Sequence, residues 1–308
     1  MNLYLPVAEM PANIYVFLTM GAAVGFLSGL FGVGGGFLMT PLLIFSGIPP
    51  AIAVGTESAQ IVASSASGAL AHWRRRNIDM EMGAVLLAGG ILGSVGGVQL
   101  VGVLRRLGTF EFFVSICYVT FLGVIGTLML IESANTIRKT RRGVTYSSRR
   151  SGQHNWIHGL PLKVRFQRSK LYISAIPPFL IGAAVGVLAA VMGVGGGFVM
   201  VPAMIYLLRV PTNLVVGTSL FQIVFLTAAT TVLHSSLNQT VDVVLAALLI
   251  VGGVIGAQFG AAASERLKGE QLRFLLAVLV LMVCLRFVWQ LVARPAELYS
   301  ISAIAAGA

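Results

Sequence analysis

The sequence predicts an all-α polytopic membrane protein that contains two homologous repeats. Of its 308 residues, 57% are hydrophobic and only 10% are charged, and the mean hydropathy is +0.91. Soluble globular proteins carry about 25% charged residues, so this composition is typical of a chain that lies in a bilayer. The hexapeptide Gly-Val-Gly-Gly-Gly-Phe also occurs twice, at 32–37 and 193–198, and each copy interrupts a long apolar stretch.

The first repeat, residues 14–132, is expected to hold four full spans and one short arm. Apolar stretches predict spans at 14–31, 51–73, 82–104 and 109–131. A membrane-spanning helix needs about 20 apolar residues. The arm, 37–48, follows the first glycine turn and is too short to cross a bilayer of ordinary thickness.

The second repeat, residues 172–292, shows the same order of elements. Its predicted spans are 173–192, 213–234, 241–263 and 271–292, with an arm at 198–208. The repeats are separated by a basic loop, 133–171, and followed by a tail, 293–308. Residues 1–308 are therefore interpreted as a single transmembrane domain.

The two repeats can be aligned at a nearly constant offset. Pro41 matches Pro202 at an offset of 161 residues (202 − 41 = 161), and Gln60 matches Gln222 at an offset of 162 (222 − 60 = 162). An internal duplication explains this register better than chance does.

Positive charge is concentrated between the repeats. Ten of the 21 Lys and Arg residues lie between Ile137 and Leu171, where no acid occurs. This distribution is typical of a cytoplasmic loop, with anionic lipid as a candidate partner, rather than of a nucleic-acid-binding surface. The basic turn at 74–76 belongs on the same face, whereas the equivalent turn at 235–240 is uncharged. Inverted repeats fit these charges better than parallel ones, although Arg105-Arg106 then lies outside.

The glycine turns are the first candidates for a binding site. The residues concerned are Gly34, Gly35 and Gly36 in one turn and Gly195, Gly196 and Gly197 in the other. Glycine lets bare N–H groups approach a bound molecule, and each turn opens a short helix whose N-terminus is its positive end. Two such ends near the middle of the bilayer could hold an anion. The alternative is that these glycines serve only close helix packing.

Polar side chains that follow the arms are further candidates. Thr56 and Gln60 share a helix face, as do Thr218 and Gln222, and all four could donate hydrogen bonds to an anion or to neighbouring helices. Glu57 is an acid inside a predicted span and a candidate for proton coupling.

Other functional classes receive little support from the sequence. The glycine turns lack the Gly-Lys-Ser/Thr that a Walker-type phosphate loop requires, so ATP hydrolysis is not expected. Metal-ligand spacing and a nucleophile elbow are also missing, so neither a metal, a cofactor nor an enzymatic activity is predicted.

These motifs together resemble the TauE/SafE family of membrane permeases, also called sulfite exporters. Each Gly-Val-Gly-Gly-Gly-Phe copy and its following Pro precede a Val-Gly-Thr, at 54–56 and 216–218, and a distal histidine, His72 or His234. The resemblance implies a multi-pass cell-membrane protein, located in the inner membrane, that exports small sulfur-containing anions such as sulfite or organosulfonates without ATP. The first repeat departs from the pattern at Glu57-Ser58-Ala59. Transport of another small organic anion in either direction, or a non-transporting membrane scaffold, therefore remain alternatives, and no oligomeric state is predicted.

Overall fold

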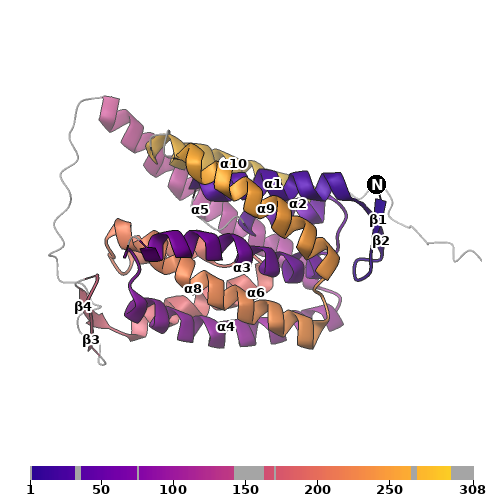
Figure 1. The fold of residues 1–308 in the computed structure, drawn as a ribbon, viewed down its shortest axis with the longest axis horizontal. Coiled ribbons are helices and arrows are strands. Elements are labelled where there is room, and N and C mark those ends of the chain that lie inside the picture. Colours follow the sequence, from indigo (N-terminus) through magenta and orange to yellow (C-terminus); the bar gives the residue numbers. More distant parts are fainter. Residues whose placement is uncertain are drawn as a thin grey trace, which may run out of the picture.

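The computed structural model describes residues 2–31, 36–74, 76–141, 163–169, 171–264 and 269–292. Most of its helices run along the long direction of the molecule, and two small hairpins lie at its opposite ends (Figure 1). The helices are α1 (Ile14–Phe31), α2 (Gly36–Phe45), α3 (Pro50–Arg74), α4 (Met80–Arg106), α5 (Phe110–Arg141), α6 (Ile176–Met192), α7 (Gly197–Tyr206), α8 (Thr212–Leu233), α9 (Val243–Ser264) and α10 (Gly269–Val292). The hairpins pair β1 (Asn2–Leu5) with β2 (Met10–Asn13) and β3 (Lys163–Phe166) with β4 (Leu171–Ser174).

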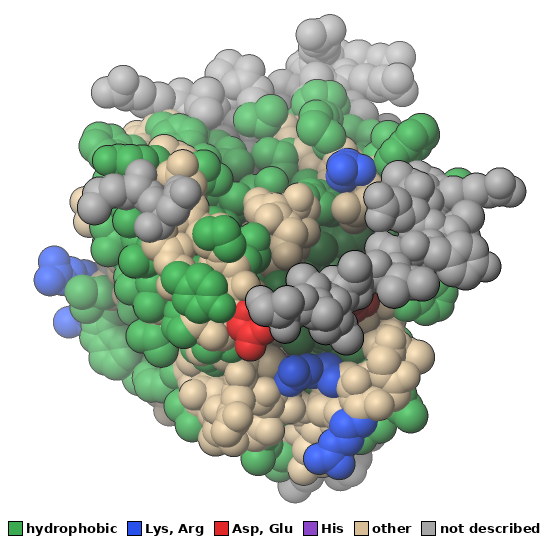
Figure 2. Space-filling model, turned by 90° about the vertical axis from the view of Figure 1, so that its right-hand side faces the viewer, with side chains coloured by type: hydrophobic (Ala, Val, Ile, Leu, Met, Phe, Trp, Pro, Cys, Tyr) green, Lys and Arg blue, Asp and Glu red, His purple; other side chains and the backbone are tan. Residues whose placement is uncertain are grey.

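The chain is a multi-pass membrane protein. Within the described residues, five helical segments are long and apolar enough to cross a bilayer: Met80–Arg106, Phe110–Ile131, Leu214–Asn238, Val243–Gly260 and Phe274–Val292. Large side chains such as Val243, Phe259 and Leu285 remain mostly exposed on these helices, as expected for a surface that faces lipid. Seen from the end that carries β1 and β2, hydrophobic side chains cover large areas of the described surface (Figure 2).

Glycines allow two pairs of helices to pack with their backbones in contact. Gly25 of α1 lies against the backbone of Gly253 of α9, and Gly186 of α6 lies against the backbone of Gly90 of α4. A Cβ atom at either position would overlap main-chain atoms of the neighbouring helix. Small residues at such contacts are characteristic of helix packing in membranes. Each pair joins a helix from one half of the chain to a helix from the other half.

The hairpins connect the two halves of the chain in the same way. Val7, in the turn of β1–β2, donates its N–H to Oδ2 of Asp242 at 3.0 Å, and Ser169, in the turn of β3–β4, donates its N–H to Oδ2 of Asp79 at 2.9 Å. The other carboxylate oxygen of each aspartate caps the first turn of α9 or α4. Each hairpin therefore holds the start of a helix that belongs to the opposite half.

The predicted spans and arms all correspond to helices, but three expectations need correction. The hairpins were not predicted, because strands of four residues leave no clear alternating pattern. The helix α5 does not end at residue 131 but continues to Arg141, and β3 and β4 occupy 163–166 and 171–174, so 133–171 is not a continuous loop. Hydropathy marks where the apolar part of a helix ends, whereas the helix itself can continue into water. The helix α8 also continues as a π-helical turn, η2 (His234–Asn238).

Candidate functional site

The second glycine turn adopts a backbone conformation that glycine alone adopts easily. After α6 ends at Met192, Gly193, Gly195 and Gly196 have φ angles of 71°, 69° and 79°. These angles lie in the left-handed region, which is strained for residues with a Cβ atom. The helix α7 then begins at Gly197, directly after this turn. Of the first turn, Gly34 and Gly35 lie outside the described residues, and α2 begins at Gly36.

The two arms begin side by side. A Cβ atom at Gly36 would lie 3.0 Å from the carbonyl carbon and oxygen of Val194, in the second turn. One residue further along each arm, the rings of Phe37 and Phe198 stack with their centroids 5.0 Å apart and an interplanar angle of 17°. The N-terminal ends of α2 and α7 therefore lie close together, and these are the ends at which a helix carries partial positive charge.

One face of α3 lines the second turn. A Cβ atom at Gly193 would lie 2.8 Å from Cα of Val54, and one at Gly195 would lie 2.9 Å from Cγ2 of Ile61. Because residues three and four apart share a helix face, Glu57 lies on the face that joins Val54 to Ile61. Glu57 is completely buried, and neither of its carboxyl oxygens has a hydrogen-bond partner among the described residues.

Tyr118 of α5 contacts the same region. Its hydroxyl donates to the carbonyl oxygen of Met192 at 2.5 Å, directly before the second turn. Thr40 of α2 is also fully buried, and its hydroxyl would lie 3.0 Å from a Cβ atom at Gly193. Sequence analysis missed both residues. Tyr118 could have been noticed as a hydroxyl within the apolar stretch 109–131.

The two glutamines occupy equivalent places in the two halves. Nε2 of Gln60 lies in contact distance of Gly253 in α9, and Nε2 of Gln222 lies near Gly90 in α4. Both side chains are almost completely buried. In the described part of the chain, Oε1 of Gln60 and both amide atoms of Gln222 find no hydrogen-bond partner. Buried polar groups in proteins nearly always have one, so these atoms require an explanation.

The two threonines hold helix ends rather than facing the glycine turn. Oγ1 of Thr56 accepts a hydrogen bond from the backbone N–H of Asp242, and Oγ1 of Thr218 accepts one from the N–H of Asp79, both at 3.0 Å. Their role here is the interhelical hydrogen bonding that the sequence left open as an alternative. The aspartates were missed in sequence. Their common offset of 163 residues (242 − 79 = 163) could have revealed them.

The sequence is similar to that of known membrane transporters. Residues 17–287 match the profile of the family described as Sulfite exporter TauE/SafE. The chain belongs to this family. The resemblance inferred from the glycine motifs is thereby confirmed, and TauE/SafE proteins are membrane transporters rather than a class of enzymes.

The relatives of this TauE/SafE protein include several bacterial proteins of similar length. It is 30% identical over 272 residues to a probable membrane transporter protein, YjnA, of Bacillus subtilis (strain 168), covering 88% of this chain and 98% of the relative. It is 29% identical to a probable membrane transporter protein of Xylella fastidiosa (strain 9a5c), covering 90% of this chain and 96% of the relative. A shorter segment of 56 residues, 18% of this chain and 12% of the relative, is 43% identical to the Sulfite exporter TauE/SafE family protein 5 of Arabidopsis thaliana. No solved structure matches the chain.

Proposed function

We propose that this TauE/SafE protein is a secondary transporter that exports a small sulfur-containing anion, such as sulfite or an organosulfonate. The family description supports this substrate class. The observation that carries the proposal is the contact between the start of α2 and the second glycine turn, beside buried polar atoms that lack partners. Such atoms are costly to bury unless a ligand or water satisfies them.

The proposed site holds the anion through backbone and amide donors. The N–H groups of Gly34, Gly35 and Gly36 and of Gly195, Gly196 and Gly197 bind the oxyanion at the facing ends of α2 and α7. Gln60 and Gln222 supply side-chain N–H donors from opposite sides. Thr56 and Thr218 act indirectly, because each positions the start of the helix that its neighbouring glutamine contacts.

Glu57 is the proposed proton carrier. A buried carboxylate without a partner is costly, whereas the protonated acid is much less so. Binding or release of an anion beside the second turn would change that cost, because the negative charge of the anion disfavours a second negative charge on Glu57. Proton and anion movement would thereby be linked without ATP.

Alternating access is proposed to rest on two inverted repeats, residues 14–132 and 172–292. The helix α1 begins directly after β2 and the equivalent helix α6 begins soon after β4, and these hairpins lie at opposite ends of the molecule (Figure 1). Equivalent helices that begin at opposite ends are what inversion requires. The helix pairs α1–α9 and α4–α6, each joined by glycine contacts, would then each move as one rigid unit.

The deciding experiment measures anion flux in proteoliposomes. We expect sulfite efflux from vesicles that contain the wild-type protein, and a loss of about tenfold or more for Gln60→Met and Gln222→Met, since each removes a donor to the oxyanion. The matched control is Gln99→Met on α4, whose side chain is exposed. If another organic anion is transported and sulfite is not, that anion and not sulfite is the substrate. Unchanged flux in both glutamine variants would refute this site, and no flux of any anion would favour the scaffold.

A further inference from the structure

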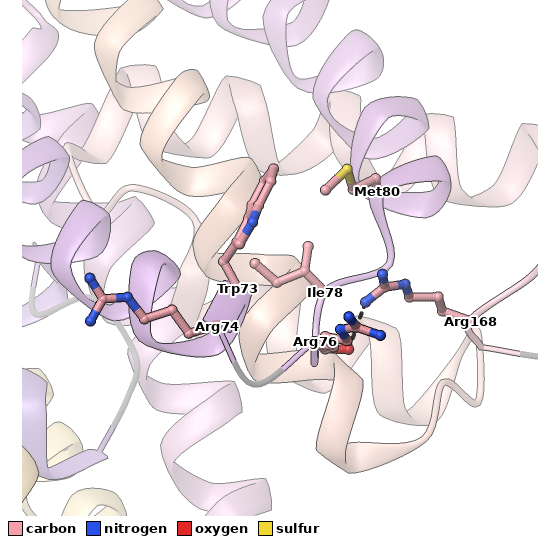
Figure 3. Close-up of a pocket in the computed structure, with 6 residues that line it drawn as sticks. All are labelled: Trp73, Arg74, Arg76, Ile78, Met80 and Arg168. Carbon is pink, nitrogen blue, oxygen red and sulfur yellow. Dashed lines mark hydrogen bonds between the residues drawn. The ribbon is translucent and has the colours of Figure 1, made fainter.

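A pocket separate from the glycine turns lies where α3 is followed by α4, at the end of the molecule that carries β3 and β4. Its volume is about 380 Å³. It is lined by Trp73, Arg74, Arg76, Ile78, Met80 and Arg168. Figure 3 shows that Trp73, Ile78 and Met80 point toward the helices and that Arg76 and Arg168 lie together on one side. The side chain of Arg74 extends to the opposite side. The pocket thus combines an apolar wall with a cationic rim.

The rim is fixed in place by hydrogen bonds to the β3–β4 hairpin. Nη1 of Arg168 donates to the backbone carbonyl of Arg76 at 2.8 Å, as the dashed line in Figure 3 marks. Ser169, the next residue, is buried and bonded to Asp79 through its N–H. The Arg168 guanidinium is therefore fixed beside the turn between α3 and α4.

The nearby acids are already engaged by the same hairpin. Oδ2 of Asp79 accepts the N–H of Ser169, and Oε2 of Glu81 accepts the N–H of Gln167 at 3.2 Å. Since none of the six lining residues is acidic, the rim presents positive charge to whatever occupies the pocket.

The equivalent turn in the other half has uncharged residues in place of Arg74 and Arg76. Gln239 occupies the position that matches Arg76 (239 − 76 = 163), and both have left-handed φ angles, of 51° and 57°. Arg74 corresponds to Ser236 (236 − 74 = 162). At that turn, Nη1 of Arg105 donates to the carbonyl oxygen of Asn238 at 2.9 Å, much as Arg168 donates to Arg76. One arginine therefore bonds to each turn, whereas Arg74 and Arg76 are basic residues without a basic counterpart.

We propose that this pocket binds the phosphate headgroup of an anionic phospholipid in the adjacent leaflet. Guanidinium groups are suited to phosphate oxygens, and the charges of the rim complement a lipid with net negative charge. The apolar wall would contact the glycerol backbone and the first acyl carbons. Trp73, which is 50% exposed, is typical of side chains at the level of lipid headgroups. A lipid would contact both the apolar wall and the cationic rim, whereas a soluble phosphate would contact only the rim.

The test is native mass spectrometry of the detergent-purified protein with added lipid. We expect phosphatidylglycerol to bind and phosphatidylcholine to bind at least tenfold more weakly. Arg74→Gln and Arg168→Gln should each weaken phosphatidylglycerol binding about fivefold, because a cationic side chain near anionic lipid contributes about 1 kcal/mol. The matched control is Arg209→Gln. Arg209 is also exposed, and it precedes α8, whose Gly217 packs against Asn77 beside the pocket.

Three results would overturn the proposal. An equal loss in the Arg209→Gln variant would indicate general surface charge. Equal binding of the two lipids would exclude recognition of net charge. Inorganic phosphate that displaces phosphatidylglycerol at equal concentration would identify a site for soluble anions. If Arg168→Gln does not fold, because its bond to Arg76 is lost, Arg74→Gln alone decides between these outcomes.

Discussion

At the scale of single residues, the unusual feature of this protein is a group of buried polar atoms without partners. Glu57, Gln60 and Gln222 are almost completely buried, and five of their oxygen and nitrogen atoms lack hydrogen-bond partners in the described ranges. Each such group costs about 1–3 kcal/mol relative to a satisfied one. A protein selected for stability alone would carry apolar residues there. Function is the better explanation for a cost of this size.

Gln222 is expected to lower the free energy of unfolding of the protein. We expect Gln222→Met to raise the free energy of unfolding by about 1 kcal/mol, because it removes a buried amide that has no partner while keeping a similar side-chain volume. Thermal unfolding in detergent, without substrate, measures the change. Gln99→Met, on the exposed surface of α4, should leave the unfolding temperature unaltered. A lower stability for Gln222→Met would mean that its amide is bonded in the native protein.

The proposed proton carrier can be tested by a pH gradient. Wild-type anion flux should respond to such a gradient, because Glu57 can release its proton on the alkaline side and regain it on the acidic side. Glu57→Gln resembles the protonated acid and cannot titrate, so its flux should no longer depend on the gradient. Stopped-flow measurements in proteoliposomes, with Glu111→Gln as an exposed control, make the comparison. Persistent gradient dependence in Glu57→Gln would exclude this role.

At the scale of elements, the sequence predicted the helices well and the hairpins not at all. The glycine hexapeptides located both arms. All eight predicted spans are helices, and within the described residues five of these are long and apolar enough to cross a bilayer. The hairpins were missed because their contacts are long-range in sequence. Val7 and Ser169 bond to capping aspartates that lie 235 and 90 residues away. The interhelical contacts of Thr56 and Thr218 could not be found from the sequence for the same reason. Their partners, the N–H groups of Asp242 and Asp79, could be identified only once the halves were seen to interlock.

The aspartate caps should therefore stabilise the junction between each hairpin and its helix. Asp79→Ala removes the acceptor for Ser169 and for the first turn of α4, and a lost cap alone costs roughly 1 kcal/mol. We expect a total loss of about 2 kcal/mol, with faster amide hydrogen exchange in β3–β4 and at the start of α4. Glu81→Ala, which is exposed and removes only the bond to Gln167, should cost less. Equal losses of stability in Asp79→Ala and Glu81→Ala would contradict the stabilising role of the Asp79 cap.

Close packing between α4 and α6 gives a second prediction at this scale. A Cβ atom at Gly93 would overlap the backbone of Ala183, whereas one at Gly96 would meet no atom within 4 Å. Gly93→Ala should therefore destabilise the protein by about 1–3 kcal/mol through overpacking. Gly96→Ala should be neutral or stabilising by about 0.5 kcal/mol, since alanine favours the helix. Chemical unfolding measures the free energy of unfolding of the two variants. Similar free energies would show that α4 and α6 can move apart at Gly93 without loss of stability.

At the scale of the whole molecule, each structural device occurs twice and joins the two halves of the chain. The helix α1 packs on α9 as α6 packs on α4, and each hairpin holds an aspartate of the opposite half. The glycine faces of each half are covered by helices of the other half, and each capping aspartate is bonded by a hairpin of the other half. Contacts of this kind couple the two halves, as the proposed alternating access requires.

Inversion of the repeats makes a prediction about the two sides of the membrane. Pro6 and Arg168 are exposed equivalents in the turns of the two hairpins (168 − 6 = 162). In a background with Cys117 and Cys284 replaced by alanine, a membrane-impermeant maleimide should label Pro6→Cys in intact cells. It should label Arg168→Cys only after permeabilisation, because the basic stretch around Arg168 places that hairpin in the cytoplasm. Labelling of both from one side would mean that the hairpins share a membrane face, which is incompatible with inverted repeats.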